Sequence, residues 1–208
     1  DGEVITSQKK SLSLSNTNTS FRVEMDMPET IKWWDEFTPN LYTARLRLTG
    51  DSSHDVEMTF GVRDISTKDC QFLINGRPTF MRGNLSCGAF PLTGYYSTDK
   101  AYWEKIIKTS KAYGLNHFRF HTYNPPHVAY EVADELGFYF CTEGPFWTSL
   151  KGDGPQGRYM EAEALRMLEE YGNYASFVMM GFGNEVRGDV PFFSRLMKEL
   201  KAKDSRRL

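Results

Sequence analysis

From about residue 69 the chain alternates between apolar strands and amphipathic helices, and this rhythm limits the possible fold more than any other feature. Strands are expected at 79–85, 115–121, 138–143 and 176–185. Helices are expected to follow them at 97–114, 125–137, 157–172 and 191–203, the first capped by Ser97 or Thr98 and several closed by glycine. Apolar strands that alternate with amphipathic helices indicate a parallel sheet covered by helices.

Two architectures fit such units, a doubly wound nucleotide-binding sheet and a (β/α)8 barrel. A doubly wound sheet usually carries a glycine-rich turn after its first strand. Here that turn reads RGNLSCGAFPLTGYY, at 82–96, and matches neither G-x-G-x-x-G nor G-x-x-x-x-G-K-[ST]. The barrel is therefore favoured, with about four of its eight βα units in residues 69–208.

Residues 1–68 follow a different pattern. Apolar and polar residues alternate there, which predicts short strands at 11–15, 20–27, 41–50 and 55–65. A turn signal, GDSS, separates the last two, and no helical pattern interrupts them. We therefore predict part of an antiparallel β-sandwich over 1–68, followed by a separate α/β domain over 69–208.

Composition narrows the class of partner. The 208 residues carry a formal net charge of −2, with both signs interspersed, so a nucleic acid partner is not expected. No apolar stretch is long enough to predict a membrane span. Three scattered cysteines give neither a disulfide framework nor a metal-binding pair, and Cys141, in an apolar run, is expected to be a buried thiol. The first residue is not Met, and we expect the chain to be a piece of a longer protein.

Polar and aromatic side chains gather where the four predicted strands end. They are Arg82, Asn84 and Cys87 after the first, Arg119, His121, Tyr123 and Asn124 after the second, Glu143, Phe146 and Trp147 after the third, and Asn184 and Glu185 after the fourth. Ligands of α/β folds bind at the carboxyl edge of the strands, so these residues are expected to share one site.

Each candidate also has a structural interpretation. Glu185 could be a solvated loop residue, although Gly181 and Gly183 would permit close backbone approach beside it. Arg119 and Glu143 could form a buried ion pair as readily as they could bind a ligand, and His121 could be a core histidine. Surface, loop or turn positions are expected for the remaining histidines, His54, His117 and His127.

Several stretches resemble glycoside hydrolase family 2, which contains β-galactosidases and β-glucuronidases. The chain between about residues 20 and 200 carries the resemblance in WWDEFTPNLYTARLRL, FGVRDI, FLINGRPTFMRGN, YEVADELGFYFCTE and EEYGNYASFVMMGFGNE. The resemblance implies the closing strands of an immunoglobulin-like domain, followed by the first half of a (β/α)8 TIM barrel.

The resemblance also implies roles. Glu185 would be the general acid/base of a retaining β-glycosidase, and Asn184 would hydrogen-bond the sugar 2-hydroxyl. Arg119, His121, Glu143 and Trp147 would contribute to substrate binding, with an oligosaccharide or glycoside as partner. The nucleophile of the family is a Glu at the end of the seventh strand, which this chain does not reach. No cofactor is implied.

The chain departs from the family pattern at several positions. Many members have Arg-Thr-Ser-His-Tyr-Pro after the second strand, whereas this chain has RFHTYNPP, with Thr122 where the usual His stands and His121 as a candidate replacement. The stretch EGPFWTSL lacks the metal-binding Glu and His of some β-galactosidases. We therefore expect no metal, and the sugar stays undetermined.

Alternatives remain open. The chain could be a non-catalytic carbohydrate-binding or structural piece, and Glu143 could be a second catalytic carboxylate, although Arg119 is its natural partner. Half a barrel would leave strand edges and an inner face open, with Phe118, Phe140, Val178 and Met180 on that face. We therefore expect the isolated chain to self-associate through its open barrel edges and to hydrolyse nothing.

Overall fold

The computed structural model describes residues 2–13 and 20–208. The chain divides into two compact units, Asp1–Lys32 and Trp33–Leu208. The described residues of the first unit contain no strand, so the strand predicted at 20–27 is wrong. Of the strand predicted at 11–15, residues 11–13 are not in a strand, and the other two lie outside the described residues. An alternating pattern becomes a strand only where a neighbouring strand completes its hydrogen bonds.

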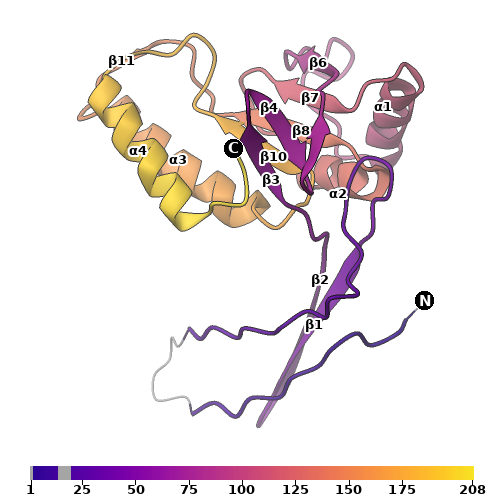
Figure 1. The fold of residues 1–208 in the computed structure, drawn as a ribbon. Coiled ribbons are helices and arrows are strands. Elements are labelled where there is room, and N and C mark those ends of the chain that lie inside the picture. Colours follow the sequence, from indigo (N-terminus) through magenta and orange to yellow (C-terminus); the bar gives the residue numbers. More distant parts are fainter. Residues whose placement is uncertain (1, 14–19) are drawn as a thin grey trace. The chain divides into compact units, whose positions relative to one another are not determined.

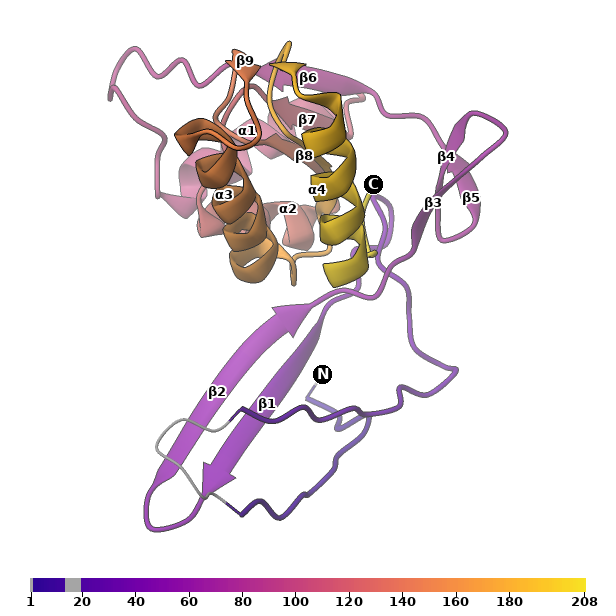
Figure 2. The same cartoon turned by 90° about the vertical axis from the view of Figure 1, so that its left-hand side faces the viewer.

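The second unit begins with antiparallel strands (Figures 1 and 2). β1 (Tyr42–Thr49) and β2 (Ser53–Phe60) form a hairpin, which confirms the strand predicted at 41–50 and places the second one slightly earlier than 55–65. His54 consequently lies in a strand, not in a turn. β3 (Ile65–Lys68), β4 (Gln71–Ile74) and β5 (Arg77–Thr79) form a three-stranded sheet. Asn75 and Gly76, both at positive φ, make the tight turn between β4 and β5.

A four-stranded parallel sheet follows, as the rhythm of the sequence predicts. Its spatial order is β10-β8-β7-β6, made of β6 (Gly83–Ser86), β7 (His117–Phe120), β8 (Tyr139–Glu143) and β10 (Phe177–Gly181). The helices that alternate with these strands are α1 (Lys100–Ala112), α2 (His127–Leu136), α3 (Pro155–Tyr171) and α4 (Val190–Lys203). Two short strands, β9 (Ser149–Leu150) and β11 (Arg187–Gly188), pair with each other beyond β8 and β10. The unit is therefore a mixed α/β structure.

The helix ends show how local chemistry sets these boundaries. Asp99, and not Ser97 or Thr98, caps α1, because its carboxylate accepts a hydrogen bond of 3.0 Å from the Ala101 N–H. The Ser97 hydroxyl instead accepts from the Asp99 N–H. Gly137 ends α2 at φ 67°, a left-handed conformation that glycine adopts readily.

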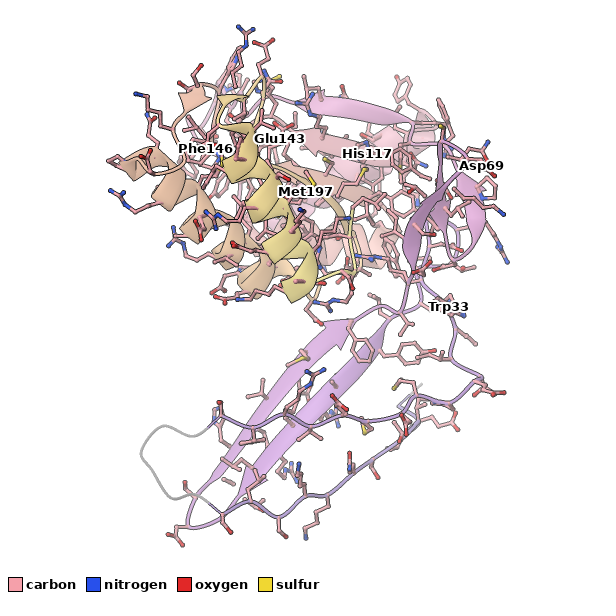
Figure 3. The ribbon with its side chains drawn as sticks, turned by 60° about the vertical axis from the view of Figure 1, so that its left-hand side comes forward. Trp33, Asp69, His117, Glu143, Phe146 and Met197 are labelled. Carbon is pink, nitrogen blue, oxygen red and sulfur yellow. The ribbon has the colours of Figure 1, made fainter. Side chains whose placement is uncertain are left out.

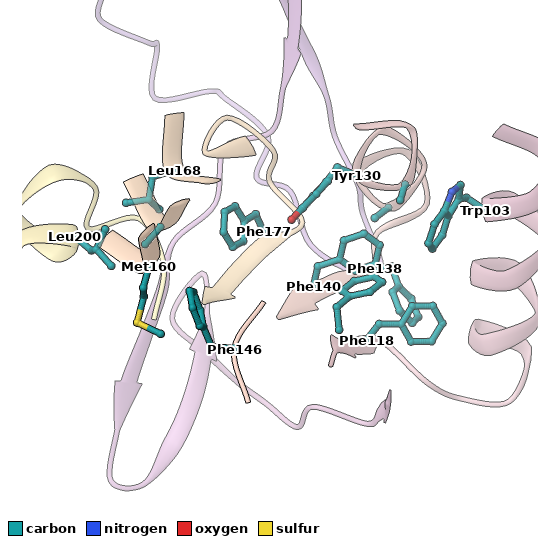
Figure 4. Packing of buried hydrophobic residues seen from close by; sticks show 14 of the residues in the cluster. Trp103, Phe118, Tyr130, Phe138, Phe140, Phe146, Met160, Leu168, Phe177 and Leu200 are labelled. Carbon is teal, nitrogen blue, oxygen red and sulfur yellow. The ribbon is translucent and has the colours of Figure 1, made fainter. Parts of the chain in front are cut away.

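The main core lies on the helix-covered face of the sheet (Figure 4). Phe118 and Phe140 are buried there with Phe138, and Trp103 of α1 and Tyr130 of α2 belong to the same cluster. Our expectation that Phe118 and Phe140 would line the open inner face is therefore wrong, because successive residues of a strand point to opposite faces.

A second cluster covers part of the other face of the sheet. Val178 packs there with Tyr139, Trp34, Ile65 and Ile74, whereas Met180 packs against the main core. The edge of β10, expected to be open, is paired at two positions: the Leu208 N–H donates to the Val178 carbonyl, and the Met180 N–H donates to the Leu208 carbonyl, both at 3.0 Å. Within residues 2–13 and 20–208, no helix combines the length and the apolar character of a membrane span.

Candidate active site

The candidate site lies where β7, β8 and β10 end. Glu143 is the last residue of β8, His121 follows β7, and Asn184 and Glu185 follow β10. Figure 3 shows Glu143 and Phe146 at the opposite end of the second unit from Trp33. The parallel direction of these strands places residues that are far apart in the sequence at one edge of the sheet.

Arg119 joins two of the loops. Its Nε donates to Glu143 Oε1 at 2.6 Å, and its Nη2 lies 2.5 Å from the same oxygen, which confirms the predicted ion pair. Nη2 also donates to Asn184 Oδ1 at 3.0 Å. The guanidinium therefore orients the Asn184 side chain so that its oxygen faces Arg119 and its NH2 group points elsewhere.

Glu143 is held in a tight, nearly closed position. Its side chain is 4% exposed, and its Oε2 is buried without a hydrogen-bond partner among the described residues. Gly181 leaves room for it, since a Cβ at that position would stand 3.2 Å from Glu143 Cγ. A buried carboxylate oxygen without a donor is costly, and a ligand hydroxyl would satisfy it.

Glu185 occupies a more open position than Glu143. It is exposed, and its Oε2 accepts a hydrogen bond of 3.0 Å from Trp147 Nε1. The Trp147 indole is in turn edge-on to the His121 imidazole, with ring centroids 5.1 Å apart and an interplanar angle of 86°. Glu185, Trp147 and His121 thus form a second group, and each comes from a different loop.

Not every residue predicted to lie at this edge does so. β6 begins at Gly83, so Arg82 precedes the strand and lies at its other end, where its Nη2 donates to Glu36 Oε2. Asn124 accepts a hydrogen bond from the Tyr130 hydroxyl. Tyr123 does lie at this edge, because its hydroxyl is 2.7 Å from that of Ser86, the last residue of β6; burial raises the pKa of Tyr123 to about 12.

Two further groups lie on β7 and β8. His117 lies within β7, so the expected surface or loop position is wrong, and burial lowers the pKa of its imidazole to about 4. Cys141, predicted to be a buried thiol, is only partly buried, and this burial raises the pKa of its thiol to about 12. Neither group is charged near neutral pH. Across the part of the chain that the structure describes, no three His, Cys, Asp or Glu side chains gather as metal ligands would.

Comparison with known proteins identifies the relatives of this chain. The family model of "Glycosyl hydrolases family 2" matches residues 1–63. The β-galactosidase large subunit of Latilactobacillus sakei is 28% identical over 179 residues, which cover 76% of this chain and 28% of that protein. The β-galactosidase of Staphylococcus xylosus is 30% identical over 168 residues, 73% of this chain and 16% of its own length.

Solved structures share the fold. A β-glucuronidase from Parabacteroides merdae superposes with a TM-score of 0.69 at 24% identity, covering 85% of this chain and 24% of that one. A β-D-glucuronidase from Dictyoglomus thermophilum gives a TM-score of 0.73 at 22% identity, covering 85% and 33%. The chain thus spans less than a third of the length of the curated relatives that it matches here. These matches confirm the resemblance to this hydrolase family.

Proposed function

We propose that this chain, a relative of glycoside hydrolase family 2, is part of a retaining β-glycosidase that hydrolyses O-glycosidic bonds. The observation that carries the proposal is the arrangement after β10: Glu185 is exposed beside Asn184, whose side chain is held by the Arg119–Glu143 pair. The β-galactosidases among its relatives support the same class of reaction.

Glu185 is the general acid/base in this proposal. Cleavage of a glycosidic bond requires a proton on the leaving oxygen, and a second carboxylate must attack the anomeric carbon. The exposed carboxyl of Glu185 can reach a substrate oxygen, and the Trp147 N–H bond fixes one of its two oxygens. In the second step the same group would take a proton from water, which then releases the sugar with its configuration retained.

The neighbouring residues would bind the sugar. The Asn184 amide NH2 makes no hydrogen bond within the described residues, so it can donate to a sugar hydroxyl such as the 2-hydroxyl. Glu143 Oε2 is buried and would accept from another hydroxyl once its side chain moves toward the sugar, and His121 and Trp147 offer ring surfaces. Glu143 serves binding in this proposal and not nucleophilic attack, because Arg119 neutralises its other oxygen.

The nucleophile would come from the rest of a longer protein. We propose that residues 69–208 form the first half of a (β/α)8 barrel and that residues 1–68 belong to an immunoglobulin-like domain. The greater length of the relatives supports this proposal. The chain alone would then hydrolyse no glycoside, and the edge of β6, the other edge strand of the sheet, would favour self-association.

The decisive experiment compares leaving groups in the full-length protein. Glu185→Gln should slow glycosylation strongly for sugars with poor leaving groups and much less for activated aryl glycosides, which need little protonation. Glu170→Gln, at an exposed position of α3, is the matched control and should leave both substrates unaffected. An equal loss on both substrates would rule out the acid role.

The stereochemistry of the product tests the retaining mechanism separately. Proton NMR of the first-formed sugar should show the anomeric configuration of the substrate. Inversion would mean that water attacks the anomeric carbon directly, and the retaining mechanism would then be wrong.

A further inference from the structure

The loop that carries Glu185 is bonded to the loop that carries Trp147. Residues 182–189 follow β10, residues 144–154 follow β8, and three backbone hydrogen bonds join them. Asn184 N–H donates to the Phe146 carbonyl at 2.9 Å, Arg187 N–H to the Thr148 carbonyl at 3.2 Å, and Asp189 N–H to the Leu150 carbonyl at 3.2 Å. We call these three bonds the loop ladder. It extends the neighbouring strands β8 and β10 beyond the sheet.

Glycines permit the close approach of these two loops. A Cβ at Gly183 would overlap the Phe146 carbonyl oxygen, and a Cβ at Gly188 would overlap that of Leu150. On the other loop, a Cβ at Gly144 would stand only 2.7 Å from the Phe182 carbonyl oxygen. Every one of these contacts is with backbone, which cannot move aside as a side chain can. The ladder is therefore specified by the sequence.

Glu185 has an unusual backbone between two steps of the ladder. Its φ is +49°, in the left-handed region that residues other than Gly, Asn and Asp seldom adopt. Such a conformation persists only where the surrounding structure holds it. The steps at Asn184 and Arg187 supply that support on either side of Glu185.

Trp147 lies in the same interval of the opposite loop, between Phe146 and Thr148. The residue is 62% exposed, so packing in the core does not fix the indole. The indole instead contacts two candidate site residues. Its N–H donates to the Glu185 carboxylate, and its ring packs edge-on with the His121 ring. An exposed indole that is oriented by two candidate site residues suggests a role in the site.

We propose that Trp147 is a positioning residue that orients the carboxyl group of Glu185 through its indole N–H. This inference rests on the proposed function of Glu185. An indole nitrogen can only donate, so Glu185 Oε2 is occupied as an acceptor and the proton to be transferred is carried by Oε1. After the transfer the N–H remains bonded to the carboxylate and stabilises its charge.

The test uses the full-length enzyme with Trp147→Phe and Trp147→Tyr, two variants that differ by one hydroxyl donor. For substrates with poor leaving groups, Trp147→Phe should lower kcat/KM by about tenfold to a hundredfold, the range for a hydrogen bond to a charged group. The basic limb of its pH profile should move to higher pH, since the charged form of the acid loses a donor. Trp147→Tyr should restore part of both properties.

Other ionisable groups near Glu185 also contribute to the pH profile, so they must be the same in the variants and in the unchanged enzyme. All of those on the three loops and their strands are unchanged in these variants: His117, Arg119, His121, Tyr123, Tyr139, Cys141, Glu143, Lys151, Asp153, Arg187 and Asp189. Trp33→Phe is the matched control, because Trp33 is 49% exposed and lies at the other end of the unit (Figure 3). It should change neither the pH profile nor kcat/KM.

Two outcomes would overturn the positioning role. One is a loss in Trp147→Phe that is equal for all leaving groups and lies wholly in KM, as expected if the ring only stacks on the sugar. The other is an unchanged pH profile. Glu185→Gln separates the two proposals: if it keeps full activity on poor leaving groups, the proposed function fails, whereas if it loses that activity and Trp147→Phe does not, only the positioning role fails.

Discussion

The two ends of the parallel sheet differ in how exposed their polar side chains are. At the amino end of β7, Asn116 donates to Glu36 Oε1 at 2.9 Å and accepts from the Arg82 N–H at 2.8 Å. Near the amino end of β10, the Asp134 carboxylate of α2 accepts from the N–H groups of Ala175 and Ser176, at 3.1 and 2.7 Å. Asn116 and Asp134 thus have both of their polar side-chain atoms hydrogen-bonded inside the protein. These bonds contribute to the stability of the fold.

The carboxyl end has candidate residues that are exposed. Among the described residues, each end has a buried polar atom without a hydrogen-bond partner, Glu143 Oε2 at the carboxyl end and His117 Nε2 at the amino end of β7. At the carboxyl end, Glu185 has one oxygen bonded to Trp147. Glu185 and Trp147 are also exposed, unlike Asn116 and Asp134. The difference supports our proposal that the carboxyl end of the sheet binds the substrate, while the hydrogen bonds of Asn116 and Asp134 at the amino end contribute to stability.

The largest effect on stability is expected at Asp134. Asp134→Ala would leave two buried backbone N–H groups without acceptors, which should lower the free energy of unfolding by about 2–6 kcal/mol. Denaturant unfolding measures this loss. Activity per folded molecule should stay unchanged, because the site lies at the other end. A loss of specific activity with unchanged stability would break the proposed division between the ends.

A smaller effect on stability is expected at Arg119. Its side chain is 40% exposed, so solvent screens part of the loss, and Arg119→Met should lower the free energy of unfolding by about 1–3 kcal/mol. Adding Glu143→Gln should restore part of the stability, since the buried charge is then gone. It should not restore activity. If the double variant regained activity as well, the pair would be structural only.

The pH dependence of stability sharpens the comparison at the amino end. Burial raises the pKa of Asp134 to about 6, above its ordinary value of about 3.9 in an unfolded chain. The folded state therefore holds this proton over a pH range in which the unfolded state releases it, so the contribution of Asp134 to stability falls as pH rises from about 4 to 6. Asp134→Asn should remove this slope. Identical slopes for both proteins, measured by urea unfolding at several pH values, would contradict this explanation.

The smallest effect is expected away from both ends. Arg47 pairs with Asp55 across the β1–β2 hairpin at 2.7 Å, with both side chains more than half exposed. Water and salt screen such a pair. Arg47→Ala should therefore leave the thermal midpoint of unfolding and the activity unchanged. A clear drop in the midpoint would show that this ion pair stabilises the hairpin although it is exposed to solvent.

Much of the α/β architecture could be predicted because it depends on local patterns. Apolar runs and glycine stops located the four strands and four helices between residues 79 and 203 to within a few positions. The Arg119–Glu143 pair was also predictable, since a buried Glu needs a cation such as an Arg on the adjacent strand. Periodicity and charge compensation are both properties that a sequence displays directly.

The errors arose where position depends on distant contacts. An offset of a few residues at the start of β6 moved Arg82 to the wrong end of its strand. An error of one residue in the phase of a strand exchanges its faces, and this misplaced Phe118 and Phe140. The bonds from Asp134 to Ala175 and Ser176, and from Trp147 to Glu185, join residues about 40 positions apart. No local pattern signals such pairs.

The most direct test of the account measures activity and stability together for Glu185→Gln in the full-length enzyme. The account predicts that kcat/KM for a glycoside with a poor leaving group falls by about 10²–10⁴-fold, the usual contribution of general acid catalysis. It also predicts that the free energy of unfolding changes by no more than about 0.5 kcal/mol, as for other surface substitutions. An unchanged kcat/KM, or a loss of activity explained by unfolding, would contradict the assignment of the carboxyl end of the sheet to catalysis.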